Sequence, residues 1–393
     1  LLLFTANQQF MLTTDSDVLS PNTAKINSVS AYNFNTTTNP ISLGTTTGWL
    51  DNAGKQSRFF EMTRLAREGE PTVIEQSKAV DKIFPKEIDL LCNSRENNLL
   101  LFAEKGERWV YGYRYFNTSE NRLMQSWFKW YLSGTIQYMC MLDDAYYAVL
   151  RNNSKDVLQK FPIKLDDTSH FTTDDNDTTS DTSDDITYRV HLDNSKVIAA
   201  SALGFSTSTE RTGFTLPEGF NDSTQQLAVY CHSSGSKQGL YGLGTLYGTG
   251  SNTNVEFAGD WTGQDLIVGY LYDMEVKFPT IYYTQQQGNK VRSDVNGSLV
   301  VHRVKFNFGK SGVYETVLKR IGKPDYTELH ESKITDSYEA DTISFQEDQR
   351  RTVAVYEKNT NLDLTLKSTH ASPATLFSMT WEGDYTSRFY RRV

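Results

Sequence analysis

Short runs of apolar residues, separated by polar turns, recur along the whole chain. Typical runs are Leu99–Ala103, Trp109–Phe116 and Met124–Tyr131, and the turns between them are Glu104–Glu107 and Asn117–Asn121. Runs of this length bounded by turn residues predict β-strands joined by hairpins. The 22 Tyr and 21 Phe residues strengthen that prediction, because aromatic residues are enriched in strands. The pattern therefore predicts a mainly β protein with few short helices.

A weak internal repeat organises the first part of the chain. The run that begins at Ile88 reappears 48 residues later at Ile136, with a cysteine four residues after the isoleucine in both copies. A third, poorer copy begins 47 residues before the first of these, at Ile41. A period in the upper forties with several short strands per unit is typical of β-propeller blades. We therefore predict partial propeller blades in residues 1–163.

The first twelve residues, LLLFTANQQFML, have the pattern of two strands around a polar turn. The apolar stretches are Leu1–Phe4 and Phe10–Leu12, and Asn7–Gln9 lies between them. Closed propellers have about four to eight blades, more than these strands and three repeat copies supply. We expect the rest of the propeller upstream of residue 1. Leu1–Leu12 should then pair with strands from that part, or expose an unpaired edge without it.

One segment of the first part has a helical rather than a strand pattern. Pro71 is suited to the first turn of a helix, and Val73, Val80 and Phe84 fall on one helical face. Pro85 would end the helix. The sequence predicts a short helix between the two prolines.

A second β-rich part begins at Ile186, with runs such as Leu266–Phe278 and Leu299–Phe308. Asn296-Gly297 precedes the latter run and is a strong hairpin signal. The acidic, low-complexity segment Lys164–Asp185 marks either a boundary or an insertion loop between the two parts. We expect three regions: blades in 1–163, an acidic loop with a variable β insertion in 164–254, and a C-terminal β-rich domain in 255–393.

The acidity of the chain is local. The net charge is −9, but Lys164–Asp185 alone holds eight Asp and one Lys, so the other 371 residues carry only −2. The general basic surface of a DNA-binding protein is therefore absent. No run approaches the roughly 18 apolar residues of a membrane-spanning helix, and we expect no membrane insertion.

Patterns that would indicate catalysis are weak. Cys92, Cys140 and Cys231 are too widely spaced for a disulfide framework or a structural zinc site. Phe308–Gly312 ends like a phosphate loop but lacks the earlier glycine, so we interpret it as a hairpin turn. Asp143-Asp144 could form a carboxylate pair for glycoside hydrolysis, although a turn between two strands is the better interpretation. No enzymatic activity, cofactor or metal is indicated.

A glycine-rich segment, GLYGLGTLYGTG at Gly239–Gly250, superficially resembles a nucleotide-binding loop. No helix follows it, so a pyrophosphate would lack its cluster of donors, and we expect a flexible surface loop. Its apolar and aromatic side chains would be costly to expose singly, which makes them candidates for a partner surface. These side chains are Tyr241, Leu243, Leu246 and Tyr247.

The acidic segment has three alternative roles: a solvated loop, a divalent-cation loop, or an element that docks a basic partner. The calcium-binding EF-hand pattern needs a glycine at its sixth position and a glutamate at its twelfth, and the segment has neither. The solvated loop is therefore favoured. The candidate residues are Asp174, Asp175, Asp177, Asp181, Asp184 and Asp185.

Several stretches taken in order support a resemblance to a known family. They are LLLFTANQQFMLTT, ISLGTTTGWLDNAGKQSRFFEMTRL, MQSWFKWYLSGTIQYMCMLDDAYYAVLRNN, FAGDWTGQDLIVGYLYDMEVKF and the closing WEGDYTSRFYRR. The chain resembles the C-terminal portion of the tail tubular protein B family, the nozzle proteins of T7-like short-tailed phages (podoviruses). The resemblance covers residues 1–163 and about 255–393, and residues 164–254 depart from it.

The resemblance implies a structural protein of the virion. Six copies would form a homohexameric ring below the tail adaptor protein, enclose the channel through which the viral DNA leaves, and support the tail fibres. It also implies a mainly β fold with a propeller followed by β-sandwich-like domains, and it carries over no catalytic residue and no cofactor. A nearly neutral chain suits a conduit, because Lys and Arg contacts to phosphate would have to be broken for the DNA to move. An acidic segment facing the channel would repel DNA, and one facing outward would be solubilising or would dock a basic fibre surface.

The basic C-terminus is a candidate subunit contact, because Arg and aromatic residues are common interface anchors; the alternative is a frayed, solvated end. The residues are Arg388, Phe389, Tyr390 and Arg391. Two other classes of protein stay open besides the nozzle protein. One is a glycan-binding or glycan-degrading spike-like virion protein, and the other is a host propeller enzyme unrelated to phages.

Overall fold

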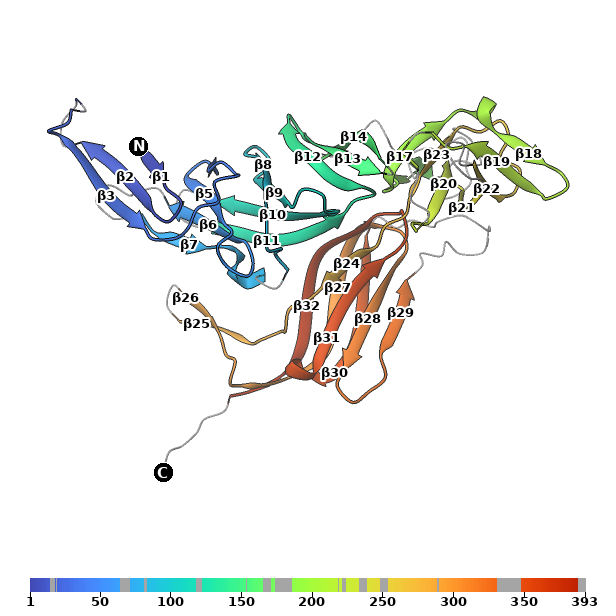
Figure 1. Ribbon diagram of the computed structural model, residues 1–393. Helices are drawn as coiled ribbons and strands as arrows, with labels where there is room; N and C mark the ends of the chain where they lie inside the picture. Colours follow the sequence, from blue (N-terminus) through green and yellow to red (C-terminus); the bar gives the residue numbers. More distant parts are fainter. Residues whose placement is uncertain are drawn as a thin grey trace. The chain divides into compact units, whose positions relative to one another are not determined.

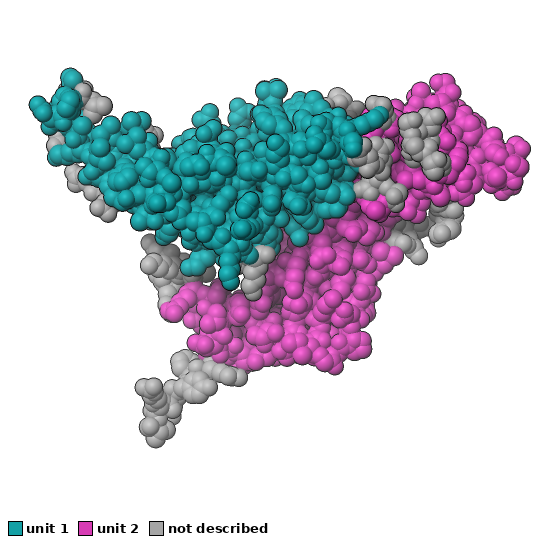
Figure 2. Space-filling view, viewed as in Figure 1, with its two compact units in different colours: residues 1–166 teal, residues 167–393 magenta. Residues whose placement is uncertain are grey.

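The computed structural model of the chain consists of antiparallel β-sheets (Figure 1). It describes residues 1–387 except 15–17, 19, 64–70, 81–82, 118–121, 153, 165–170, 174–185, 218, 221–223, 233–238, 248–253, 288–289 and 331–347. Helical structure in these residues is limited to the 3-10 turns η1 (Ser77–Val80), η2 (Ala200–Ala202) and η3 (Asn359–Asn361). The prediction of a mainly β protein with few short helices is confirmed. The chain divides into two compact units, Leu1–Asp166 and Asp167–Val393 (Figure 2).

Unit 1, Leu1–Asp166, is a series of four sheets, each made of strands consecutive in the sequence. The first sheet contains β1 (Leu2–Phe4), β2 (Gln9–Thr14) and β3 (Ala24–Ser30), and the second β4 (Ile41–Ser42), β5 (Thr46–Asp51), β6 (Arg58–Thr63) and β7 (Val73–Glu75). The third contains β8 (Leu90–Ser94), β9 (Leu99–Ala103), β10 (Trp109–Asn117) and β11 (Arg122–Tyr131), and the fourth β12 (Thr135–Leu142), β13 (Ala145–Asn152) and β14 (Lys155–Pro162).

Successive sheets of unit 1 pack face to face across separate cores. Phe4 of the first sheet packs with Trp49 and Phe60 of the second. On the opposite side of the second sheet, Phe59 packs with Phe102 of the third. A third core joins the third sheet to the fourth. Each sheet after the first is therefore held by apolar contacts to the sheet that precedes it in the sequence.

The two middle sheets are buried on both faces, which explains their uninterrupted apolar runs. All five residues of β9, Leu99–Ala103, are buried. Leu100 and Phe102 face the core shared with the second sheet, whereas Leu101 and Ala103 face the core shared with the fourth. Successive side chains of a strand point to opposite faces, so a strand covered on both sides needs apolar residues at every position.

Each copy of the repeat supplies one of these sheets. Ile41 begins β4, Ile88 lies just before β8, and Ile136 is in β12. The period seen in the sequence therefore corresponds to the second, third and fourth sheets of the series.

The helix predicted after Pro71 is wrong. Val73–Glu75 is strand β7, which pairs with β6, and the helical structure among the described residues between it and Pro85 is the 3-10 turn η1. Val73 packs against the core between the first and second sheets, but Phe84 packs against the core on the other side of the second sheet. The residues expected to share a helical face thus serve two different cores. The β-branched pair Val-Ile gains ladder hydrogen bonds at the edge of the second sheet instead.

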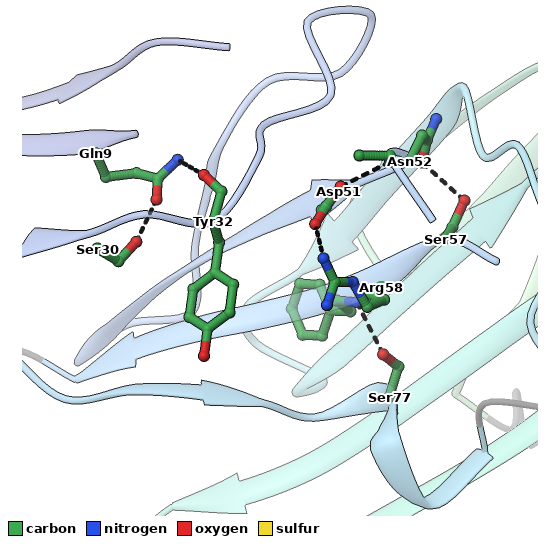
Figure 3. Close-up of polar contacts among 10 residues, drawn as sticks. Gln9, Ser30, Tyr32, Asp51, Asn52, Ser57, Arg58 and Ser77 are labelled. Carbon is green, nitrogen blue, oxygen red and sulfur yellow. Dashed lines mark hydrogen bonds and ion pairs between the residues drawn. The ribbon is translucent and has the colours of Figure 1, made fainter. Parts of the chain in front are cut away.

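The opening stretch forms the expected pair of strands, β1 and β2, but its polar turn is shorter than predicted. Gln9, assigned to the turn, is fully buried and begins β2. Its Nε2 donates to the carbonyl oxygen of Tyr32 at 3.0 Å, and its Oε1 accepts from the Ser30 hydroxyl (Figure 3). Both polar ends of the buried amide are therefore satisfied. The pairing of Leu1–Leu12 with strands outside this chain stays a prediction.

Unit 2, Asp167–Val393, begins with the hairpin of β15 (Phe171–Thr173) and β16 (Ile186–Tyr188) and continues with a seven-stranded sheet. The order of that sheet is β17 (Asp193–Ile198), β23 (Leu266–Tyr270), β20 (Leu227–Cys231), β21 (Tyr241–Tyr247), β22 (Asn254–Ala258), β19 (Arg211–Thr215) and β18 (Gly204–Ser206). Val229 and Phe257 lie on its core face, and Trp261, which follows β22, packs against that face. Part of the other face contacts a smaller cluster that includes Ala371 from the end of the chain.

Two more sheets of unit 2 face each other across a single core (Figure 1). One contains β24 (Met274–Lys277), β31 (Leu362–Ser368), β28 (Tyr314–Arg320) and β29 (Tyr326–His330), and the other β30 (Gln349–Lys358), β27 (Ser298–Ser311) and β32 (Ala374–Thr386). A separate hairpin is formed by β25 (Thr284–Gln287) and β26 (Lys290–Ser293). Phe306 and Val353 pack from one sheet and Leu318 and Leu364 from the other.

The hairpins predicted at Asn296-Gly297 and Phe308–Gly312 are wrong, although the first is a turn. Asp294 Oδ1 accepts the backbone amides of Asn296 at 2.9 Å and Gly297 at 3.0 Å. The flanking strands β26 and β27 do not pair, and β27 pairs with β30 and β32. Phe308–Gly312 contains the end of β27, and the next strand, β28, belongs to the facing sheet. Turn chemistry is local, whereas strand pairing is decided by packing.

Candidate interaction surfaces

Residues 241–247 of the glycine-rich segment form a strand and not the flexible loop predicted from the composition, and residues 248–250 lie outside the described residues. Tyr241–Tyr247 is β21, paired with β20 and β22. Its glycines face the core: a Cβ on Gly244 would lie 2.6 Å from Cγ2 of Val255, and one on Gly242 would be 3.7 Å from the Trp261 ring. Glycine at these positions makes room for large neighbours on the core face of the sheet.

The four candidate interface residues of this segment therefore have different environments. The ring of Tyr241 stacks on Tyr230, with centroids 5.6 Å apart, and Leu246 packs against the core. Leu243 and Tyr247 stay exposed, at 53% and 47%. Only these two are available on the surface of this chain, and their contact with a partner stays a prediction.

The other candidates lie outside the described residues. They are Asp174, Asp175, Asp177, Asp181, Asp184 and Asp185 of the acidic segment and Arg388, Phe389, Tyr390 and Arg391 of the basic end. The pairing of Thr173 with Ile186 brings together the two residues that flank the acidic segment 174–185.

An apolar row that the sequence interpretation missed lies on the outer face of the fourth sheet. Tyr138 lies opposite Val149, and Val149 lies opposite Leu158, so the three side chains form one row across the strands. Tyr138 is 59% exposed and Leu158 67%, and Leu142 on the same face of β12 is 59% exposed. Contiguous exposed apolar side chains mark surfaces that bind another protein surface. On β14, Leu158 shares this face with Asp156 and Lys160, so the sequence KDVLQKFP alone does not single it out.

A polar network holds the turn between β5 and β6 (Figure 3). The side chain of Asp51 is fully buried and accepts from the Arg58 guanidinium and, at 2.7 Å, from the amide of Ala53. The guanidinium carbon of Arg58 lies 5.1 Å from the centroid of Phe60. The buried carboxylate is thus paired and hydrogen-bonded, which suits a structural role.

Asp143-Asp144 is confirmed as a turn between β12 and β13. Asp143 has a φ of +52°, in the left-handed region that Asp tolerates in turns. Asp144 binds Lys164 at 2.9 Å and Asn97 at 3.2 Å. These hydrogen bonds, that from Lys164 above all, lower the pKa of the Asp144 carboxyl. A general acid for glycoside hydrolysis needs a raised pKa.

Two features are absent from the described part of the chain. It contains no group of three or more His, Cys, Asp or Glu side chains arranged to hold a metal ion. Among the same residues, no helix has the length and apolar character needed to cross a membrane.

Comparison with known proteins places the chain in a family of the phage tail. No curated protein matches the sequence significantly. The model of one family, the bacteriophage nozzle proteins, matches residues 1–392, almost the whole chain. Residues 164–254, which departed from the resemblance seen in the sequence, fall within this match. The chain therefore belongs to the bacteriophage nozzle protein family, whose members are structural components of the phage tail in the virion.

Proposed function

We propose that this chain forms part of the homohexameric ring at the end of a short phage tail. The ring encloses the channel through which the genome leaves and supports the tail fibres. Membership of the nozzle family over residues 1–392 is the observation that carries the proposal. The role is architectural, without catalysis or a cofactor.

We propose further that the sheets of unit 1 are an arc of a β-propeller. The face-to-face packing of sheets that follow one another at a repeat of 47 or 48 residues supports this arrangement. The end sheets carry apolar side chains on their outer faces, Ile26 on the first and Tyr138 and Leu158 on the fourth. In the complete propeller, further sheets cover these faces. The two facing sheets of unit 2 correspond to a β-sandwich-like domain.

DNA passes through the ring without sequence-specific binding. The chain outside Lys164–Asp185 carries a net charge of only −2, so it offers few uncompensated cations to retain phosphates. Segment 174–185 then repels DNA if it faces the channel, and serves solubility or fibre docking if it faces outward. The adaptor and the fibres contact surfaces of the ring other than the channel wall. Leu243 is a candidate for such a contact, because it is apolar and 53% exposed.

Electron microscopy of the purified protein and of the virion tests the proposal. We expect rings with sixfold symmetry and a central channel, and an antibody to the chain should label the distal end of the tail. A gel-shift assay at physiological salt should detect no sequence preference for DNA. A protein that stays monomeric at high concentration, together with a label on the capsid, would contradict the proposal.

A spike-like glycan-binding protein is the second candidate function, and one observation favours a glycan site. Tyr247 borders a polar hollow on the outer face of the seven-stranded sheet. A glycan site is compatible with the nozzle function, because a tail surface can carry both.

A further inference from the structure

Two glycines lie side by side on the outer face of the seven-stranded sheet. Gly204 of β18 is the register partner of Gly213 of β19, and Gly213 is paired in turn with Glu256 of β22. A hollow of about 400 Å³ lies over these strands. Because neither glycine has a side chain, the backbone of these strands forms the floor of the hollow.

The glycine at 204 is not required by the fold. A Cβ built there meets nothing closer than a carbonyl oxygen at 3.9 Å, and the backbone is not in the left-handed region. Glycine inside a strand costs about 0.5–1 kcal/mol relative to alanine. Glycine in a strand often marks a bulge, a tight bend, or the close approach of a ligand or another backbone. The register of β18 with β19 shows no bulge at Gly204.

Polar side chains form the walls of the hollow. On one side lies Arg211, whose Nε is 3.2 Å from Glu256 Oε1. On the other side Thr215, Asn254 and Tyr247 form one row across three strands, and the Thr215 hydroxyl donates to Asn254 Oδ1 at 2.8 Å.

Tyr247 provides the aromatic element of the site. Its side chain is 47% exposed, and its hydroxyl lies 3.3 Å from the position of a Cβ on Gly213. The phenol thus reaches over the glycine floor and leaves part of its ring surface open to a ligand.

These features define the chemistry of the ligand. The charges of Arg211 and Glu256 cancel, so the hollow favours neither anions nor cations. Hydroxyl, amide and ion-pair groups around an aromatic ring offer donors, acceptors and an apolar surface together. The volume of about 400 Å³ is in the range of small-molecule sites. We propose that this hollow binds a neutral sugar unit of a saccharide chain, a binding function separate from the ring and channel.

Saturation-transfer NMR and calorimetry with the whole chain test the site. The probes are glucose, galactose, mannose, N-acetylglucosamine and disaccharides of these sugars, with inorganic phosphate as a charged comparison. We expect binding of at least one sugar and none of phosphate. Tyr247→Ala should weaken sugar binding about tenfold, because the ring contact is lost.

Two variants separate the site from general effects on folding. Gly204→Val places a side chain in the hollow at a position with free space, so the protein should fold but bind sugar at least about tenfold more weakly. Tyr326→Ala is the matched control, because Tyr326 on β29 is also 47% exposed and lies outside the hollow. Binding unchanged by Gly204→Val, equal losses in both tyrosine variants, competition by phosphate, or no binding of any probe would each overturn the inference. None of these results would affect the nozzle proposal, which rests on the family match.

Discussion

Substitution of Phe59 by alanine tests whether the cores between successive sheets hold unit 1 together. Its side chain is fully buried and projects from the second sheet toward the third. The ring centroids of Phe102, Tyr113 and Trp127, all on the third sheet, lie 5.2, 5.7 and 6.4 Å away. Phe59→Ala removes the aromatic ring that makes all three contacts and leaves a cavity between the sheets.

The expected loss is large for a single substitution. Truncation of a fully buried Phe to Ala costs about 3–5 kcal/mol, because the cavity adds to the lost transfer free energy. For a unit of 150–250 residues, each kcal/mol lowers the melting temperature by about 2–4 °C, so the unit 1 transition should fall by roughly 6–20 °C.

Differential scanning calorimetry of the whole chain measures this shift. Phe116→Ala is the matched control, since Phe116 lies on β10 in the same unit and is 46% exposed. Its transition should move by no more than a few degrees. If Phe59→Ala moved the transition as little as Phe116→Ala does, the cores between the sheets could not be the main source of unit 1 stability.

Three further predictions follow from the described contacts. Gly244→Ala should lower the free energy of unfolding in urea by about 1–3 kcal/mol, because the new Cβ would lie 2.6 Å from a methyl group of the buried Val255. Gly242→Ala is the control: its Cβ would have contacts of 3.5 Å or more, so its free energy of unfolding should stay within about 1 kcal/mol of wild type. Arg58→Ala should cost about 3 kcal/mol in the same assay by leaving the fully buried Asp51 carboxylate without its cation. Asp51→Asn should also destabilise the protein, because an amide has one acceptor oxygen for two donors, the Ala53 N–H and the Arg58 guanidinium. Burial lowers the pKa of His330 from its usual value of 6.5. Below pH 6.5 the unfolded chain therefore binds more protons than the folded chain, and the free energy of unfolding should decrease as the pH falls. His330→Gln should remove that part of the pH dependence of the free energy of unfolding.

The β class and many strands could be predicted from the sequence because the determining signals are local. The run Leu99–Ala103 is strand β9 with the same boundaries, and the repeat beginning at Ile41, Ile88 and Ile136 corresponds to three sheets. An apolar run between turn residues needs no knowledge of distant residues to be identified. The continuity of the run is explained by burial on both faces, since the third sheet packs between two others.

The errors concern properties that depend on distant partners. The segment Val73–Glu75 has a helical pattern, but the free edge of β6 offers it ladder hydrogen bonds, and tertiary pairing overrides local preference. Asn296-Gly297 is a turn as its residues require, yet the strands around it belong to different sheets. The apolar row of Tyr138, Val149 and Leu158 was missed because three strands contribute it, and its register becomes visible only once they pair.

The glycine-rich segment was misinterpreted for a different reason, since its strand signal was present. From Tyr241 to Tyr247, side chains alternate between the two faces of the sheet, with Gly242, Gly244 and Leu246 on the core side. From Tyr241 to Gly244, large and small residues therefore alternate with the period of a strand, and the glycine content alone suggested flexibility. The same alternation reduces the candidate partner surface, because Leu246 faces inward and Tyr241 is stacked on a neighbouring ring. The exposed positions that remain are Leu243 and Tyr247, and Tyr247 stands at the edge of the polar hollow. Composition identified a surface of interest, and the periodicity of the strand decides which of its residues can act there.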